Sequence, residues 1–197
     1  MSKEKRQIEK EDLIPVEIYT KSRKQIRKDL VEFKKNRRIA LGPYATFYFE
    51  SFETMVAQVQ EMLHIEKGGD EQLKDELIAY NPLVPNGKEL TATLMIEIDN
   101  PLSRGAFLGK VGGIEEKIYM KIDNDEVKAV PEADVDRTSA EGKASSVQFI
   151  HFKLNDDLIS KFKSDSATIE LGIDHKEYTH TTRLAENSVK SLCADFI

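Results

Sequence analysis

The chain has 197 residues, enough to bury a hydrophobic core of its own, so it is expected to fold as one unit. Its composition, with 40% hydrophobic and 32% charged residues, excludes disordered and fibrous proteins. A formal net charge of −6 weighs against nucleic-acid binding, because DNA and RNA are themselves polyanions.

The sequence carries no sign of export or membrane insertion. No apolar stretch approaches the ~20 residues that cross a bilayer, and the N-terminus lacks the apolar region of a secretory signal. A single cysteine, Cys193, cannot form an internal disulfide, which favours the cytoplasm. We expect residues 1–11 to be a flexible tail and residues 12–197 to form one domain. Cys193 shares a predicted helical stripe with Val189, Leu192 and Phe196, so we expect it to be buried.

Apolar side chains recur at helical spacing in several segments that begin at capping residues. The clearest helix follows Ser51, carries an apolar stripe from Phe52 to Leu63, and ends at Gly68. The other predicted helices are a short one capped by Asp12, then Lys21–Arg37, Asp70–Tyr80, Asn100–Val111, Asn155–Lys163 and Asn187–Phe196.

Other segments alternate between apolar and polar residues, as half-buried strands do. Leu90–Ile98 alternates most regularly, and the remaining strands are Arg38–Leu41, Tyr44–Glu50, Glu116–Ile122, Val127–Val130, Ser145–Leu154 and Ala167–Ile173. These roughly seven strands come in adjacent groups, which favours antiparallel pairing over strand–helix alternation. We predict an α+β fold, with a largely antiparallel sheet and helices packed mainly on one face. The polar segment Glu132–Ala144 is expected to be a flexible loop.

Positive charge is concentrated in residues 21–38, which contain nine Lys and Arg residues and two carboxylates and so carry a local charge of +7. We favour a solvated helix face that pairs with the chain's own carboxylates. The alternatives that stay open are binding of nucleic acid, of a phosphorylated ligand or of an acidic partner. We predict an interaction or self-pairing surface that does not bind DNA. Its representative residues are Arg23, Arg27, Lys34 and Arg37.

Glu61 and His64 lie one helical turn apart, a spacing that lets a carboxylate and an imidazole reach one metal ion. The pair occurs only once, and both residues lie opposite the apolar stripe, so a solvated pair is the favoured interpretation.

A second group of candidates could form a polar pocket. Glu66 continues the apolar stripe of the helix after Ser51, so it either reaches water where the helix frays or is buried near Glu50 or His151. His151 is interpreted as a hydrogen-bonded core histidine ahead of a catalytic role. We take Glu50, Glu66 and His151 as a candidate pocket.

The densest chemical cluster follows the predicted strand Ala167–Ile173, in the position where active-site loops commonly lie. The five-residue separation of its two histidines suits neither a helical nor a same-face strand pair, which disfavours a local metal site. The cluster consists of Asp174, His175, Tyr178 and His180.

The segments FYFESFETMVAQVQEMLHIEK, AYNPLVPNGKELTATLMIEI, SSVQFIHFKL and LGIDHKEY resemble an uncharacterised bacterial family, a domain of unknown function. The resemblance covers nearly the whole chain. It rests on the pattern E-x-x-E/D-T-x-x-x-Q-x-Q-E-M-L and on the turn at Asn81–Pro82. Here the pattern is formed by Glu50, Glu53, Thr54, Gln58, Gln60 and Glu61. The family more often has a basic residue where this chain has His64, which further disfavours a metal site there.

The resemblance implies that related proteins are encoded beside rubrerythrin-like and iron–sulfur oxidoreductase-like proteins, and hence a role in redox or peroxide-defence physiology. It implies no activity, and one cysteine cannot hold an iron–sulfur cluster. The favoured hypothesis is a non-catalytic binding or accessory protein that recognises a partner protein or a small ligand. The alternative is a metal-dependent or carboxylate- and histidine-based enzyme. The sequence identifies no cofactor.

Overall fold

The computed structural model describes residues 6–132, 138–140 and 142–197. The fold is α+β, as predicted, and its described strands are all antiparallel. They form two sheets where one was predicted. The five-stranded sheet contains, in spatial order, β1 (Arg38–Leu41), β2 (Ala45–Phe49), β3 (Glu89–Ile96), β7 (Val147–Lys153) and β6 (Val130–Pro131). The four-stranded sheet contains β5 (Asp125–Lys128), β4 (Ile118–Ile122), β8 (Ile169–His175) and β9 (Tyr178–Arg183).

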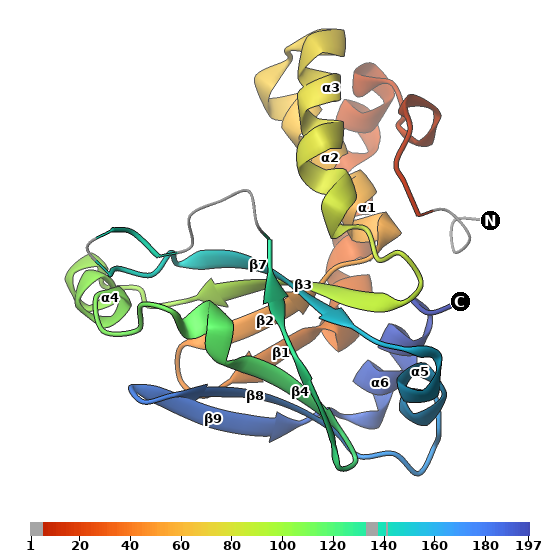
Figure 1. The fold of residues 1–197 in the computed structure, drawn as a ribbon. Coiled ribbons are helices and arrows are strands. Elements are labelled where there is room, and N and C mark those ends of the chain that lie inside the picture. Colours follow the sequence, from red (N-terminus) through yellow and green to blue (C-terminus); the bar gives the residue numbers. More distant parts are fainter. Residues whose placement is uncertain (1–5, 133–137, 141) are drawn as a thin grey trace.

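The two sheets pack face to face around the larger hydrophobic core (Figure 1). On β3 the alternation predicted from the sequence places every second side chain in this core. The opposite sheet contributes the same pattern from β4 and β8. The buried residues from these three strands are Leu90, Ala92, Leu94, Ile96, Ile118, Met120, Ile122, Ile169, Leu171 and Ile173.

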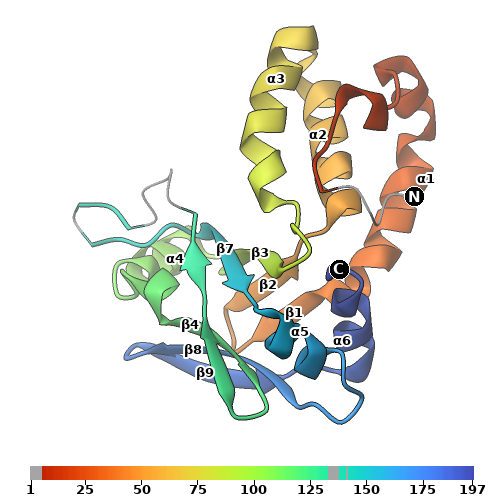
Figure 2. The same cartoon turned by 45° about the vertical axis from the view of Figure 1, so that its right-hand side comes forward.

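Three helices stand together on the outer side of the five-stranded sheet (Figure 1 and Figure 2): α1 (Val16–Lys34), α2 (Phe52–Glu66) and α3 (Gly69–Tyr80). They enclose a second, smaller core, against which Phe149 of β7 also packs. The side chain of Ser51 caps α2, as predicted, by accepting from the backbone N–H of Thr54. The buried members of this core are Ile8, Met55, Val59, Leu63, Leu73, Leu83 and Val84.

The remaining helices cover the ends of the sandwich. α4 (Pro101–Leu108) lies at one end, and α5 (Asp156–Phe162) and α6 (Glu186–Cys193) lie at the other (Figure 1). Asn100 and Asn155 cap α4 and α5 through their side-chain oxygens. Short 3-10 turns cover Lys10–Asp12, Lys35–Arg37, Asn81–Leu83 and Ile114–Lys117. Among the described helices, none has the length and apolar character to span a bilayer.

The N-terminal segment differs from the expected flexible tail in its described part. Ile8 is only 1% exposed and packs in the smaller core. The side chain of Asn81 accepts from the backbone N–H of Ile8 at 2.7 Å and donates to its carbonyl at 3.2 Å. A single buried aliphatic residue among charged neighbours therefore anchors this segment. One apolar residue does not form a pattern that can be recognised in the sequence. The first five residues lie outside the described part.

Two further segments, β9 and Glu132–Ala144, bear on the sequence-based expectations. Strand β9 was not predicted, because Tyr178 is its only apolar and only buried residue and the strand therefore lacks an apolar signal. The predicted loop Glu132–Ala144 falls partly outside the described residues, at positions 133–137 and 141. Within its described part, Thr138 and Ala144 form an isolated antiparallel bridge.

Arg37 is the largest departure from the predicted basic surface, because its side chain is only 2% exposed. Its Nε donates to the carbonyl of Phe49 at 3.0 Å, and its Nη2 donates to the carbonyl of Glu50 at 2.6 Å. Its Nη1 donates to the carbonyl of Ser191 at 3.1 Å, and the guanidinium forms an ion pair with Asp195. The side chain therefore joins the end of α1 to the β2–α2 junction and to the segment after α6.

We predict that Arg37→Met lowers the free energy of unfolding by about 3–5 kcal/mol, because it leaves a buried carboxylate without its partner. Urea unfolding followed by circular dichroism measures the loss. The control is Arg38→Met, whose ion pair with Glu97 is exposed and should be worth less than about 1 kcal/mol. Arg37→Met together with Asp195→Leu should recover part of the loss. Equal losses for Arg37→Met and Arg38→Met would refute the interpretation.

Candidate functional site

Helix α1 is long but barely buried. Among its 19 residues, only Tyr19 is buried. Ile26, Leu30 and Phe33 recur at helical spacing, as predicted, but they belong to neither hydrophobic core and line a depression shared with α2. Phe33 remains 39% exposed, and so does Ile14 just before the helix. An apolar stripe of α1 is therefore open to solvent.

Polar contacts attach the first half of α1 to α2. The phenol of Tyr19 donates to Glu61 at 2.6 Å, and Nε of Arg23 donates to the same carboxylate at 3.0 Å. A further contact from Nη2 of Arg23 completes a forked ion pair. The guanidinium of Arg23 lowers the pKa of Glu61 to about 2. Burial and the hydrogen bond to Glu61 raise the pKa of Tyr19 to about 12, so the phenol stays protonated.

The same contacts change the interpretation of the predicted metal pair. Glu61 is only partly solvated, because it pairs with Arg23 of α1 and is 22% exposed. His64 lies one turn further along α2, where its Nδ1 is 3.1 Å from Oγ1 of Thr20 and its ring meets Tyr19 edge-on. Each of the two residues therefore has its own partner on α1. In the described part of the chain, no cluster of three or more His, Cys, Asp or Glu residues could hold a metal ion.

A second polar attachment holds the chain just before α1. The side chain of Gln60, which is 4% exposed, accepts from the backbone N–H of Ile14 at 2.9 Å. It also donates to the carbonyl of Ile14 at 3.0 Å. Both hydrogen-bonding groups of one backbone residue are thus satisfied by one side chain. The two helices are fixed at this end of α1 without burying its apolar stripe.

Between α1 and α2 lies a groove of about 460 Å³. Half-buried Phe52, Val56 and Ala57 of α2 form one wall, and Leu30 and Phe33 of α1 belong to the other. The charged residues in its lining are all carboxylates, namely Asp12, Asp29 and Glu53. We call this feature the α1–α2 groove.

The representative cations of the predicted basic surface are absent from the lining of this groove. Arg27 and Lys34 line a smaller, adjoining recess of about 110 Å³, which also contains Glu61 and shares apolar residues such as Leu30 with the groove. Arg23 is engaged by Glu61, and Arg37 is buried. Pairing with the chain's own carboxylates, which the sequence favoured, therefore accounts for Arg23 and Arg37.

Glu50, Glu66 and His151 do not form a common pocket. Glu50 and Glu66 lie at opposite ends of α2, roughly 20 Å apart for a helix of this length. Glu66 is exposed, because α2 ends at this residue and Lys67 turns the backbone into the left-handed region. Glu50 is buried and accepts from Thr54 at 2.6 Å and from Thr93 at 2.8 Å.

His151 is the centre of a separate, satisfied polar cluster on the outer face of the five-stranded sheet. Its Nε2 lies 2.7 Å from Glu132, and its Nδ1 lies 3.3 Å from Glu89. The carboxylates contact opposite ring nitrogens, so they do not converge on one ion. Burial alone lowers the pKa of His151, but the bonds to Glu89 and Glu132 outweigh it and raise the pKa above its ordinary value. The interpretation as a hydrogen-bonded core histidine fits these contacts.

The cluster that we expected on a loop lies in the β8–β9 hairpin, with Asp174 and His175 at the end of β8 and Tyr178 and His180 in β9. Tyr178 is buried; its hydroxyl donates to the carbonyl of Leu41 at 2.6 Å and accepts from the backbone N–H of Tyr44 and of Ala45. This hydroxyl joins the β1–β2 turn to the other sheet. Gly42, at φ +66°, leaves room for Tyr178 and His180, which a Cβ would approach to 2.7 Å or less.

The remaining side chains of this cluster make their contacts within the same hairpin. Asp174 is exposed, and the buried His175 accepts from the backbone N–H of Glu177 at 3.2 Å. Ring centroids of Tyr178 and His180 are 4.5 Å apart. These contacts stabilise the hairpin, and the four side chains do not converge on a common point.

Sequence reasoning missed the α1–α2 groove. The stripe Ile26, Leu30 and Phe33 was recognised as apolar, but an apolar stripe on a helix is normally interpreted as a buried face. Only Ile14 and Phe33, both large and both partly exposed, distinguish the groove from a core.

Three comparisons place the chain among known proteins. A family model described as "Protein of unknown function (DUF3501)" matches residues 7–196. The crystal structure of a protein of unknown function from Burkholderia pseudomallei K96243 has 35% sequence identity and a TM-score of 0.90. The match covers 96% of this chain and 99% of that one. A search of curated proteins found no match.

We predict that the contribution of Glu61 to stability depends on pH. Because the folded-state pKa is depressed to about 2, the stabilisation is complete above the unfolded value near 4.5 and disappears as pH falls towards 2. The melting temperature of the parent should therefore exceed that of Glu61→Gln near neutral pH and converge with it at about pH 2. A difference that is constant with pH would contradict this origin.

His151 should show the opposite dependence. Its folded-state pKa is raised, so its stabilising contribution is complete below the unfolded value of about 6.5 and is lost as pH rises through the folded pKa. NMR titration of the imidazole protons should give a midpoint above 6.5, which Glu132→Gln should lower. A midpoint below 6.5 in the parent would show that burial outweighs the two carboxylates.

Proposed function

We propose that this chain, which belongs to the DUF3501 family, is a non-catalytic binding protein that holds an amphipathic helix of a partner protein in the α1–α2 groove. The single observation that supports this proposal is the unburied apolar stripe of α1 beside the half-buried apolar residues of α2. A helix laid in a groove between two helices is a common mode of peptide recognition.

The shape of the groove defines the partner's length. Its α1 wall runs from Tyr19 to Phe33, a rise of roughly 21 Å at 1.5 Å per residue. A partner helix of about 14 residues has the same length. Its apolar side chains would cover Leu30 and Phe33 on α1 and Val56 on α2, which are open to solvent in the free chain.

The charge of the groove defines the partner's polar residues. Its lining has three carboxylates and contains neither Lys nor Arg. A helix whose apolar face is bordered by Lys or Arg would complement these carboxylates, whereas an acidic helix would be repelled. The partner is therefore a basic amphipathic segment, and Arg27 and Lys34 border the adjoining recess without lining the groove itself.

The enzyme alternative has less support. The residues considered for it, Glu50 and His151, already have protein partners for their polar atoms, and Glu66 is exposed far from Glu50. An active site instead needs groups that converge on a position that a substrate can reach.

The test uses two synthetic 14-residue helical peptides with the same leucine pattern, one with lysine and one with glutamate at the polar positions. We predict that fluorescence anisotropy at physiological salt gives a Kd for the lysine peptide at least about tenfold below that of the glutamate peptide, a difference of about 1.4 kcal/mol. Leu30→Glu and Phe33→Ser should each weaken binding of the lysine peptide. Leu30→Glu adds a carboxylate, so its loss would come from the apolar contact and not from charge.

The matched control is Ile78→Glu, since Ile78 is also a large apolar residue but lies on α3 and is 74% exposed. It should bind the lysine peptide as the parent does. Circular dichroism melting shows whether each variant is folded. Equal affinity for both peptides, or unchanged binding by a folded Leu30→Glu variant, would refute the proposal.

A further inference from the structure

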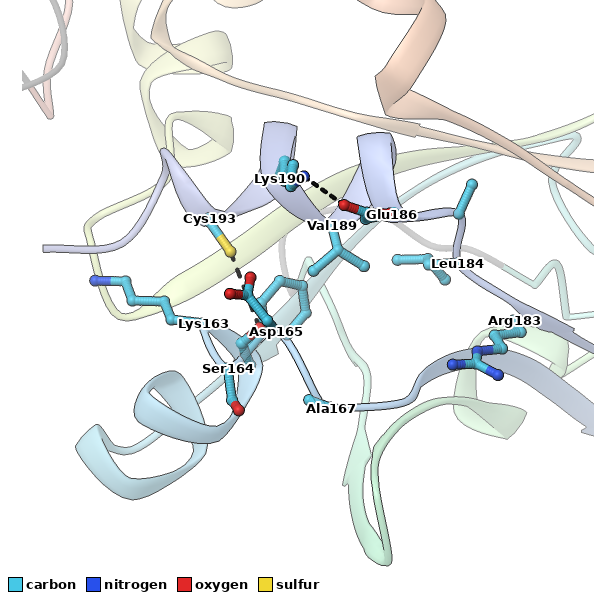
Figure 3. A pocket seen from close by; sticks show the side chains of 12 residues that line it. Lys163, Ser164, Asp165, Ala167, Arg183, Leu184, Glu186, Val189, Lys190 and Cys193 are labelled. Carbon is cyan, nitrogen blue, oxygen red and sulfur yellow. Dashed lines mark hydrogen bonds and ion pairs between the residues drawn. The ribbon is translucent and has the colours of Figure 1, made fainter.

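A second concave region lies at the opposite end of the chain, between α5, the end of β9 and α6. It is a cavity of about 960 Å³, and Figure 3 shows the side chains around it. This volume is at the upper end of the range for small-molecule sites, and it is larger than the α1–α2 groove. None of the residues chosen from sequence as candidate site residues lines it. We call it the α5–α6 cavity.

Part of the lining of the α5–α6 cavity is apolar. Phe162 and Leu184 are buried beneath it, and Ala167, Val189 and Cys193 are half-buried. Figure 3 shows Val189 and Leu184 on the same side as Cys193, above Ala167. Phe162 belongs to α5, Val189 and Cys193 belong to α6, and Ala167 and Leu184 lie in connecting segments, so the cavity is formed by the tertiary fold.

The charged lining residues have more positive than negative charge. Lys163, Arg183 and Lys190 are cations, and Asp165 and Glu186 are carboxylates. Lys190 and Glu186 form an ion pair with each other, visible as a dashed line in Figure 3. Lys163 donates to the carbonyl of Ile197 at 3.2 Å.

Arg183 differs from the other two cations. Its side chain is exposed, and within the described ranges its guanidinium makes no ion pair or hydrogen bond. In Figure 3 it lies at the opposite side of the cavity from Lys163. Arg183 is thus an unpaired cation beside an apolar cavity, which suits an anionic head group on a largely apolar molecule.

We propose that the α5–α6 cavity binds a small organic carboxylate with an aliphatic body. The carboxylate group would pair with Arg183, which can donate two parallel hydrogen bonds to it. The aliphatic body would lie on Val189, Ala167 and Cys193. This site is independent of the α1–α2 groove and of the partner helix proposed there.

Cys193 supplies a reporter for this site. Its thiol is half-buried, which corrects the expectation that it is buried, because Cys193 packs at the edge of the larger core and also lines the cavity. Its Sγ lies 3.9 Å from the carbonyl of Phe162. Burial raises the pKa of the thiol, so its reaction with a disulfide reagent should be slow and easily followed.

The experiment measures how fast 4,4′-dithiodipyridine modifies Cys193 in the full chain in the presence of octanoate, octanol, octyltrimethylammonium or acetate. Octanoate should slow the reaction at a concentration at least about tenfold below that of octanol, because only octanoate has both the charge and the chain. Acetate and octyltrimethylammonium should have little effect. Arg183→Glu should abolish protection by octanoate.

Lys24→Glu is the matched control, since it makes the same charge change on α1, and it should leave protection intact. Sedimentation with phosphatidylglycerol vesicles tests whether the head group is instead that of a membrane lipid; the proposal expects no binding. Equal protection by octanol and octanoate, or protection that survives Arg183→Glu, would overturn the proposal. Vesicle binding without protection by octanoate would overturn it too. None of these outcomes bears on the peptide assay of the α1–α2 groove.

Discussion

The buried guanidinium of Arg37 connects the two halves of the molecule. It satisfies three backbone carbonyls, from Phe49, Glu50 and Ser191, and the carboxylate of Asp195. The first two carbonyls lie where β2 leads into α2, so the same side chain sets the direction of α2 relative to the sheet. A buried charge is costly unless its partners are complete, and this requirement couples the three-helix unit to the sandwich.

That coupling explains how α1 can remain largely unburied and still be ordered. Its C-terminal end is fixed through Arg37, its first half through Tyr19 and Arg23 on Glu61, and the residue before it through Gln60. Directional polar contacts hold the helix at several points. The apolar stripe is then not needed for attachment, and it forms the wall of the α1–α2 groove.

Much of the fold could be predicted from sequence, and little of the site. The caps Ser51 and Asn155 and the alternation in β3 are local signals, and each corresponds to an observed element. The split into two sheets depends on which strands pair, for example β3 with the distant β7, and no local pattern encodes that choice. The burial of Arg37 was not predicted for the same reason, because its partners come from distant segments. The exposure of Phe33 likewise depends on the tertiary fold, since no segment in the described part of the chain covers its side chain fully.

The pairing of Arg37 with Asp195 also has a consequence for how the molecule assembles during synthesis. The two residues are 158 positions apart in the chain, so most of the protein must be made before they can meet. Before Asp195 has been made, Arg37 can donate to the carbonyls of Phe49 and Glu50, but its guanidinium has no carboxylate partner. Burial of the guanidinium is therefore unfavourable at that stage. Closing so long a loop is slow relative to forming helices. We therefore expect the three helices to take their orientation on the sheet late in folding, although the helices themselves are encoded near the N-terminus.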